Sequence, residues 1–259
     1  MLDGMERWTC EAGRGFLLGL LLWGSGGCLG YEPLPEAEGS EPVAIAALRA
    51  EPPPDGTEVF VGPAVVLAHD TFDESGAGRL GTVYLADPGQ PEGGSLQVFS
   101  AQLALSPGES LRPGDLVRGR GPFFRFRGPG CTTDPSRCFA GGRAIDQLGQ
   151  GSRLERIGVW RAPEPIELSV DAYLAEPARF QGRLVTLRDL TVREGYRPSA
   201  RGDRIQAAST EQGVAVGAEL YRVPGLEPGA RIARLTGVST FFYADVVQPR
   251  GPQDVELAP

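Results

Sequence analysis

Short runs in which apolar and polar residues alternate fill most of the chain after residue 58, and glycine and proline separate these runs. A period of two is the pattern of a half-buried β-strand, and no segment keeps a helical period for long. In the first half, the pattern predicts strands over Val59–Ala68, Gly81–Leu85, Leu96–Ser100, Asp115–Arg127 and Arg143–Leu148. In the second half, it predicts strands over Arg183–Val192, Arg204–Ala208, Val214–Val223, Ala230–Ala244 and Asp254–Leu257. Five predicted strands therefore occur twice.

The two sets are separated by a proline-containing segment, residues 161–182. Within it, Ser169 can cap a short helix that begins at Val170, and Pro177 ends that helix. We interpret this segment as a linker.

An ordered series of motifs also occurs in both halves. Leu111-Arg-Pro-Gly-Asp-Leu-Val117 matches Leu226-Glu-Pro-Gly-Ala-Arg-Ile232, and both continue into a predicted strand. Each half then has a glycine (Gly121 and Gly237) and an aromatic pair (Phe123-Phe124 and Phe241-Phe242). Each series closes with a short segment that contains Asp and Leu, Asp146–Leu148 in the first half and Asp254–Leu257 in the second. One Pro-Gly turn before a strand is common in β proteins, but the series indicates a duplicated domain.

We therefore predict an all-β fold of two tandem OB-like, five-stranded Greek-key barrels joined by a linker with one short helix. The first domain covers residues 43–160 and the second residues 183–259, with a first strand that can begin a few residues earlier. The alternative is a single β-sandwich, in which strands from both halves share a sheet.

The motifs resemble a known kind of module. Val59–Ala68, Leu80-Gly-Thr-Val-Tyr-Leu-Ala-Asp-Pro88 and Leu111–Gly121 follow one another as in the OB-fold modules of secreted bacterial proteins, including those attached to extracellular nucleases. Phe180–Val192 looks like the start of the second module in tandem versions. The resemblance covers about residues 43–257 and concerns structural motifs. We expect the nuclease domain that follows such modules in the enzymes to be missing, and the resemblance then implies a binding role without catalysis.

The N-terminus resembles the signal of a bacterial lipoprotein. An apolar run of eight residues, Phe16–Trp23, follows Arg7 and leads through Ser25-Gly26-Gly27 into Cys28. This run is too short for a membrane span, which needs about twenty apolar residues. We predict a signal peptide over residues 1–27, a lipid anchor on Cys28 and a flexible tether over residues 28–42, which are rich in Pro, Gly and Glu. An ordinary cleaved signal and a retained segment are the alternatives.

Location follows from this interpretation. An Asp directly after the lipidated cysteine would resemble a signal for retention at the inner membrane. This chain has Leu29 at that position, which favours the outer membrane. The protein then faces the periplasm or the cell surface, and its membrane partner is reached through the lipid.

Charge bears on the partners. Residues 1–27 hold three acidic residues and two arginines of a chain with 33 acidic and 25 basic residues, so the remainder has a net charge of −7. An acidic protein attracts neither nucleic acid nor an anionic bilayer through its field. We therefore do not expect a nucleic-acid partner, and we favour an envelope protein or a glycan.

The cysteines outside the signal and the anchor are Cys131 and Cys138. An even number in an exported protein favours a disulfide over free thiols. Asp134-Pro135 supplies a turn within the loop that this bridge would close. A zinc site would need four ligands, and no histidine lies near, so we predict a disulfide.

The segment Gly121–Gly128 is the best candidate for a ligand-binding face. Alternation places Phe123, Arg125 and Arg127 on one face, where aromatic and basic groups could bind a strand or a sugar as OB-folds do. In the alternative interpretation, the aromatic residues fill the barrel and its end, and the arginines pair with surface acids.

Candidates for chemistry are few. His69 stands beside Asp70 and near Asp73 and Glu74, but without the spacing of a calcium loop. No serine lies in a nucleophile elbow. We predict no catalytic residue, no metal ion and no cofactor. The expected function is that of a non-catalytic binding or assembly module at the cell envelope; the alternative is an accessory module that binds single-stranded nucleic acid or glycan.

Overall fold

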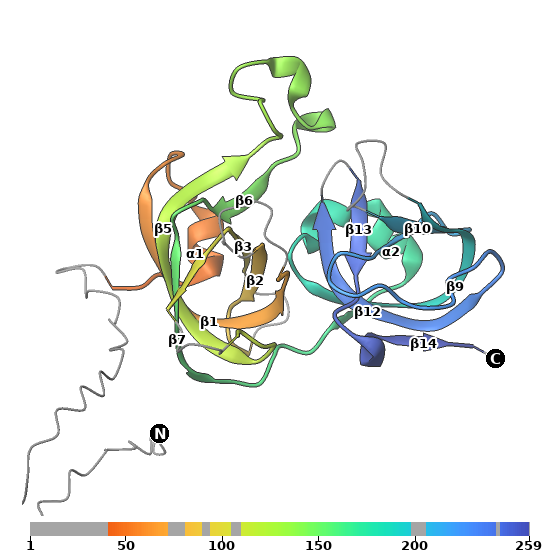
Figure 1. Cartoon of the computed structure of the whole chain (residues 1–259). Coiled ribbons are helices and arrows are strands. Elements are labelled where there is room, and N and C mark those ends of the chain that lie inside the picture. Colours follow the sequence, from red (N-terminus) through yellow and green to blue (C-terminus); the bar gives the residue numbers. More distant parts are fainter. Residues whose placement is uncertain are drawn as a thin grey trace, which may run out of the picture. The chain divides into compact units, whose positions relative to one another are not determined.

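The computed structural model describes residues 41–71, 81–89, 94–104, 110–197, 206–241 and 244–258. Within them, strands form two separate sheets, and no strand of one sheet pairs with a strand of the other. Each sheet closes into a five-stranded barrel (Figure 1). The predicted all-β fold of two OB-like barrels is therefore confirmed, and the alternative of one sandwich is wrong.

The first barrel has the strand order β1-β2-β3-β6-β5, and β5 pairs with β1 to close it. All pairings in this ring are antiparallel except that of β3 with β6, which is parallel. The strands are β1 Glu58–His69, β2 Thr82–Ala86, β3 Ser95–Phe99, β5 Asp115–Phe126 and β6 Ile145–Leu148. Outside the ring, β7 Arg153–Val159 pairs with β5, and β4 Gln102–Ala104 pairs with β7.

The second barrel repeats this topology in the order β9-β10-β11-β13-β12, closed by β12 on β9, and its parallel pair is β11 with β13. Its strands are β9 Leu184–Arg197, β10 Ala207–Thr210, β11 Ala215–Gly217, β12 Arg231–Phe241 and β13 Asp245–Gln248. Outside the ring, β14 Val255–Leu257 pairs with β12, and β8 Ile166–Glu167 pairs with β9. The duplication inferred from the motifs is thus present in the topology.

The predicted fifth strand of the second barrel is wrong. The strand near Asp254–Leu257 is β14, which lies against β12 as β7 lies against β5, and the ring strand is β13. The pattern predicted one strand from Ala230 to Ala244 because no glycine or proline stands between β12 and β13 to signal a turn.

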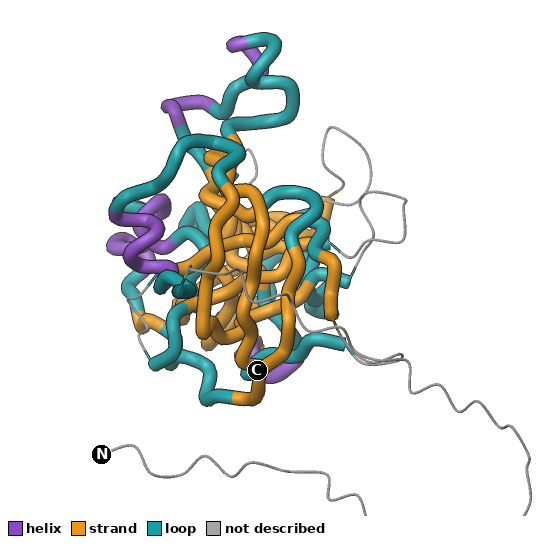
Figure 2. Tube along the Cα trace, turned by 90° about the vertical axis from the view of Figure 1, so that its left-hand side faces the viewer, coloured by secondary structure: helices purple, strands orange, loops and turns teal. Residues whose placement is uncertain are grey.

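A short helix precedes the first strand of each barrel. The helices are α1 Ile45–Ala50 and α2 Val170–Ala175, and the 3-10 helices are η1 Pro135–Arg137, η2 Ala140–Gly142, η3 Pro177–Phe180 and η4 Pro252–Asp254. The helices and helical turns lie outside the strands (Figure 2). In α2, the Ser169 hydroxyl accepts a hydrogen bond from the Ala172 amide, as predicted for the cap.

Helix α1 was not predicted. The carboxylate of Asp87 holds its N-terminus by accepting hydrogen bonds from the amides of Ile45 and Ala46, both 2.8 Å long. Because Asp87 follows β2, its partnership with α1 is invisible to local patterns. A weaker signal exists, since Glu-Pro before the helix and Ala-Glu-Pro at its end occur at both helices.

Each barrel has its own core, and a third cluster joins the two barrels. Ile45 and Leu48 of α1 pack with the core of the first barrel, and Tyr173 of α2 packs with that of the second. The joining cluster contains Leu67, Ala68, Tyr84 and Ala86 from the first barrel and Leu184 and Val238 from the second. The second barrel therefore covers part of the outer surface of β1 and β2.

Candidate functional site

Strands β2 and β3 present one face to the barrel interior and the other to the outside. Val83, Leu85, Leu96 and Val98 lie in the core of the first barrel. The alternate residues Thr82, Tyr84, Gln97 and Phe99 line a pocket on the outer face. This face of strands two and three is the one through which OB-folds bind oligonucleotides and oligosaccharides.

The pocket has a volume of about 340 Å³ and lies between the two barrels. Ile145 and Gln147 of β6 and Phe126 of β5 extend the wall formed by the first barrel. The second barrel contributes Glu219, Thr240 and Phe241. The second barrel thus reduces the outer face of β2 and β3 to a cavity of small-molecule size.

The loop between β5 and β6 contains the disulfide and forms one end of the pocket. Cys131 and Cys138 are bonded, with their Cα atoms 4.6 Å apart, which confirms the predicted bridge. Within the loop, Asp134 accepts hydrogen bonds from the hydroxyl and amide of Ser136, and these bonds lower the pKa of Asp134. Pro129, before the bridge, lines the pocket.

Three aromatic rings connect this loop to the second barrel. Phe139, after the bridge, makes edge-to-face contacts with Phe126 and with Phe241, at ring-centroid distances of 5.6 and 5.0 Å. Phe126 and Phe241 line the pocket, and Phe139 packs between them. The loop therefore supports two aromatic residues of the pocket wall.

An ion pair joins the barrels beside these rings. The Arg143 guanidinium donates to both carboxylate oxygens of Asp245, at 2.7 and 3.1 Å, and lies 4.1 Å from the centre of the Phe241 ring. Two-point contact of this kind fixes the orientation of the two side chains as well as their distance.

Tyr173 of α2 lies near this ion pair. Burial raises the pKa of Tyr173 to about 12, although its hydrogen bond with the Ser239 hydroxyl opposes this shift.

The pocket combines carboxylates, amides, hydroxyls and phenyl rings. Asp70 and Glu219 supply the carboxylates, one from each barrel, and Gln97 and Gln147 supply the amides. No arginine is among the described residues that line the pocket. This composition suits a ligand that forms hydrogen bonds and also has an apolar face.

The predicted ligand-binding face is wrong for Phe123. Its side chain is fully buried in the core of the first barrel, whereas Arg125 and Arg127 are exposed. Residues along β5 alternate as predicted, but Phe123 points into the barrel, and Phe126, on the opposite face of the strand, lines the pocket. For Phe123, the alternative interpretation, that the ring fills the barrel, is correct.

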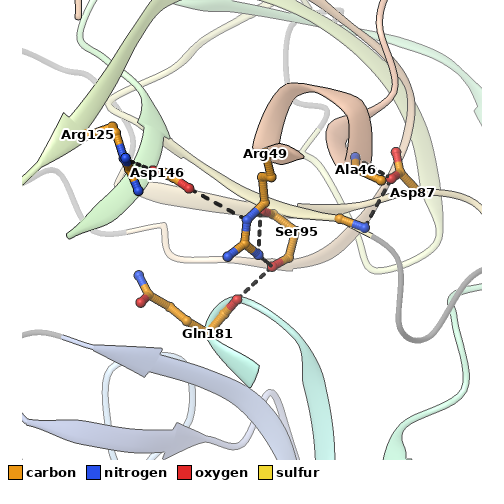
Figure 3. Close-up of polar contacts among 8 residues, drawn as sticks. Ala46, Arg49, Asp87, Ser95, Arg125, Asp146 and Gln181 are labelled. Atoms are coloured by element: carbon orange, nitrogen blue, oxygen red, sulfur yellow. Dashed lines mark hydrogen bonds and ion pairs between the residues drawn. The ribbon is translucent and has the colours of Figure 1, made fainter. Parts of the chain in front are cut away.

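Arg125 belongs to an ionic network that ties α1 to the barrel. The Asp146 carboxylate contacts Arg125 at 3.1 Å and Arg49 of α1 at 3.6 Å (Figure 3). Arg49 also donates to the Ser95 hydroxyl, which in turn donates to the main-chain oxygen of Gln181, 2.7 Å away. The charge of Arg125 is therefore paired with Asp146, as the alternative interpretation predicted for the arginines.

His69 lies at the end of β1, and both of its ring nitrogens are buried without a hydrogen-bond partner among the described residues. Burial lowers the pKa of His69, while Asp70 and the main chain of Leu111, which lies near but forms no hydrogen bond with the ring, oppose this shift. Within the described ranges, no group of three or more His, Cys, Asp or Glu side chains could hold a metal ion.

Some predictions fall outside the described residues. They concern Cys28 with the signal and most of the tether, and Asp73 and Glu74 of the loop after β1. Among the residues that the structure describes, no helix is long and apolar enough to cross a membrane.

The pocket residues themselves were not predicted. Thr82, Tyr84, Gln97 and Phe99 alternate with buried aliphatic residues, and this alternation by itself predicts only strands. Polar and aromatic residues on the outer face of β2 and β3 are the signal that could have found the site. Comparison with protein-family models gives no match, and comparison with curated proteins gives none either.

Proposed function

We propose that this protein is an exported, non-catalytic binding module that holds a small ligand between its two barrels. The observation that carries the proposal is the 340 Å³ pocket on the outer face of β2 and β3, the face that OB-folds use for ligands. Its mixture of convergent polar groups and aromatic walls is typical of a ligand site.

The pocket favours a small ligand over a nucleic-acid strand. An OB-fold that binds single strands needs an open cationic groove along several nucleotides. Here Leu184 and Val238 of the second barrel pack against Tyr84 and Ala86, and the described lining residues include two carboxylates and no arginine. The likeness to nuclease-associated modules therefore supports a binding role more than a nucleic-acid ligand.

The signal sequence supports a place at the cell envelope. A lipid on Cys28 would anchor the protein at the outer membrane, with the barrels at the end of a tether that includes Pro33 and Pro35. A glycan or an envelope protein would then be within reach. Labelling with fatty acid should mark the wild type and not Cys28→Ser; equal labelling of both would exclude the anchor.

The binding function can be tested by thermal shift with a library of neutral, cationic and anionic small molecules. A ligand at a hundred times its dissociation constant stabilises the folded state by about 2.7 kcal/mol. Thr82→Trp, which fills the pocket, should abolish the shift. Thr57→Trp, at an exposed position in the turn before β1, should preserve it. If no compound stabilises the wild type, or if Thr82→Trp responds normally, the proposal is wrong.

A further inference from the structure

Two glutamine side chains lie next to each other on the floor of the pocket. Gln97 of β3 and Gln147 of β6 are direct partners in the parallel pairing of these strands, so both project from the same face of the sheet. Tyr84 of β2 is the partner of Gln97 on its other side. A row of three polar side chains thus crosses three strands of the pocket wall.

The two amides are available to a ligand. Within the described part of the chain, neither the Gln97 nor the Gln147 side chain has a hydrogen-bond partner, and both line the pocket. Each amide offers two N–H donors and one oxygen acceptor. A ligand that satisfies adjacent amides must itself carry several groups that both donate and accept, and hydroxyl groups do this.

Aromatic rings stand beside this polar row. Phe99 is the next residue after Gln97 on the same face of β3, and its partner on β2 is Thr82. Phe126 of β5 is the partner of Ile145 of β6 and also lines the pocket. A phenyl ring offers an apolar surface to the C–H face of a sugar, whose hydroxyl edge can reach the amides at the same time. The pocket therefore matches a ligand with one polar edge and one apolar face.

Size sets a second limit. At about 30 Å³ for each water-sized group, the 340 Å³ pocket has room for roughly eleven such groups. This is about the size of one pyranose ring with its substituents.

A peptide fits the wall less well. Extended peptides gain affinity by main-chain pairing with an open sheet edge. Strands β2, β3 and β6 are paired on both sides within the closed barrel, so recognition here must use side chains. The described lining residues also lack a cation that would favour an acidic ligand.

We propose that the pocket binds one uncharged pyranose residue of a glycan, with Gln97 and Gln147 as the residues that recognise its hydroxyl groups. This assignment rests on the proposed function, because it gives a ligand class to the same pocket.

The test uses the side-chain amide signals in a ¹⁵N–¹H NMR spectrum. The chain has no asparagine, so all such signals come from glutamine, and single substitutions assign those of Gln97 and Gln147. The probes are the methyl pyranosides of glucose, galactose, mannose and N-acetylglucosamine, with the methyl glycoside of glucuronic acid, which keeps its free carboxylate, as the charged counterpart. We expect at least one neutral probe to shift both signals, with a dissociation constant of about 1 mM. We expect the methyl glycoside of glucuronic acid to bind at least tenfold more weakly than methyl glucoside.

Variants separate recognition from packing. Gln97→Leu combined with Gln147→Leu should weaken binding at least tenfold, and Gln97→Glu, which keeps the size of the side chain, should also weaken it. Gln102→Leu is the matched control, because Gln102 is exposed on β4 and lies outside the pocket. All variants should keep the backbone spectrum of the wild type.

The possible failures can be told apart. If pyranosides bind while the double variant retains its affinity, or if only another chemical class shifts the two amide signals, the sugar assignment is wrong and the proposed function stands. If no compound of any class shifts these signals or stabilises the protein, both are wrong.

Discussion

His69 should make the free energy of unfolding depend on pH, and this dependence can be assigned to one residue. It is the single histidine of the chain, and burial lowers its pKa from the usual 6.5. The unfolded chain therefore takes up a proton at a higher pH than the folded protein. Stability should fall as the pH drops below 6.5, by at most about 1.4 kcal/mol per pH unit, until the lowered pKa is reached. Urea denaturation at pH 7.5 and 5.5 measures this loss.

His69→Gln provides the control, since its side chain does not titrate. Its stability should change less between these two pH values than that of the wild type, whatever its absolute stability. Equal changes in the two proteins would show that His69 does not cause the dependence.

At the residue scale, the sequence predicted alternation but not its direction. Phe123 and Phe126 lie on opposite faces of β5, as the period of two requires, yet only the closed barrel decides which face is inside. The disulfide of Cys131 and Cys138 could be predicted because the expectation of an exported protein and the even number of remaining cysteines both favour it. The contact of Glu219 with the pocket could not, since it depends on how the second barrel covers the first.

At the element scale, the loop that joins β5 and β6 should owe part of its order to the disulfide. The bridge links residues seven positions apart, for which loop entropy predicts a stabilisation of about 2.5 kcal/mol. Since Pro129 and Phe139 flank the bridge and form or support the pocket wall, reduction should also weaken ligand binding. Guanidinium denaturation with and without reductant measures the stability, and thermal shift reports the ligand.

Cys131→Ser combined with Cys138→Ser separates the bridge from other effects of the reductant. This variant should behave like the reduced wild type and should not respond to reductant. A reductant effect of similar size in the variant would contradict the role of the bridge.

The elements themselves differ in how far local sequence predicts them. Helix α2 was predicted because its cap at Ser169 and its stop at Pro177 are local. Helix α1 was missed because Asp87 holds it from a distant position. Strand β13 was missed because no glycine or proline marks the turn from β12, and its pairing with β11 spans a long connection. Such long-range partners leave no mark in a short window of sequence.

At the scale of the whole molecule, the duplication produced two barrels with different roles. The first carries the pocket on the outer face of β2 and β3, and the second covers this face with β12, whose C-terminal half is buried throughout. The covering contact is apolar at Leu184 and Val238 and ionic at Arg143 and Asp245. A pocket between the barrels therefore requires that they remain together.

This contact predicts that the two barrels unfold as one unit. Leu184 is buried in the cluster that joins them, so Leu184→Asp places a charge where apolar side chains from both barrels meet. An unpaired charge in such a place costs several kcal/mol, mostly at the contact between the barrels. In differential scanning calorimetry, the wild type should show one transition and Leu184→Asp two. Leu174→Asp, at an exposed position on α2, should keep the single transition. Two transitions in the wild type would mean that the cover is not coupled to the barrel that it closes, so that the pocket could open without unfolding either barrel. One transition in Leu184→Asp would mean that the contact at Leu184 is not what couples the two barrels.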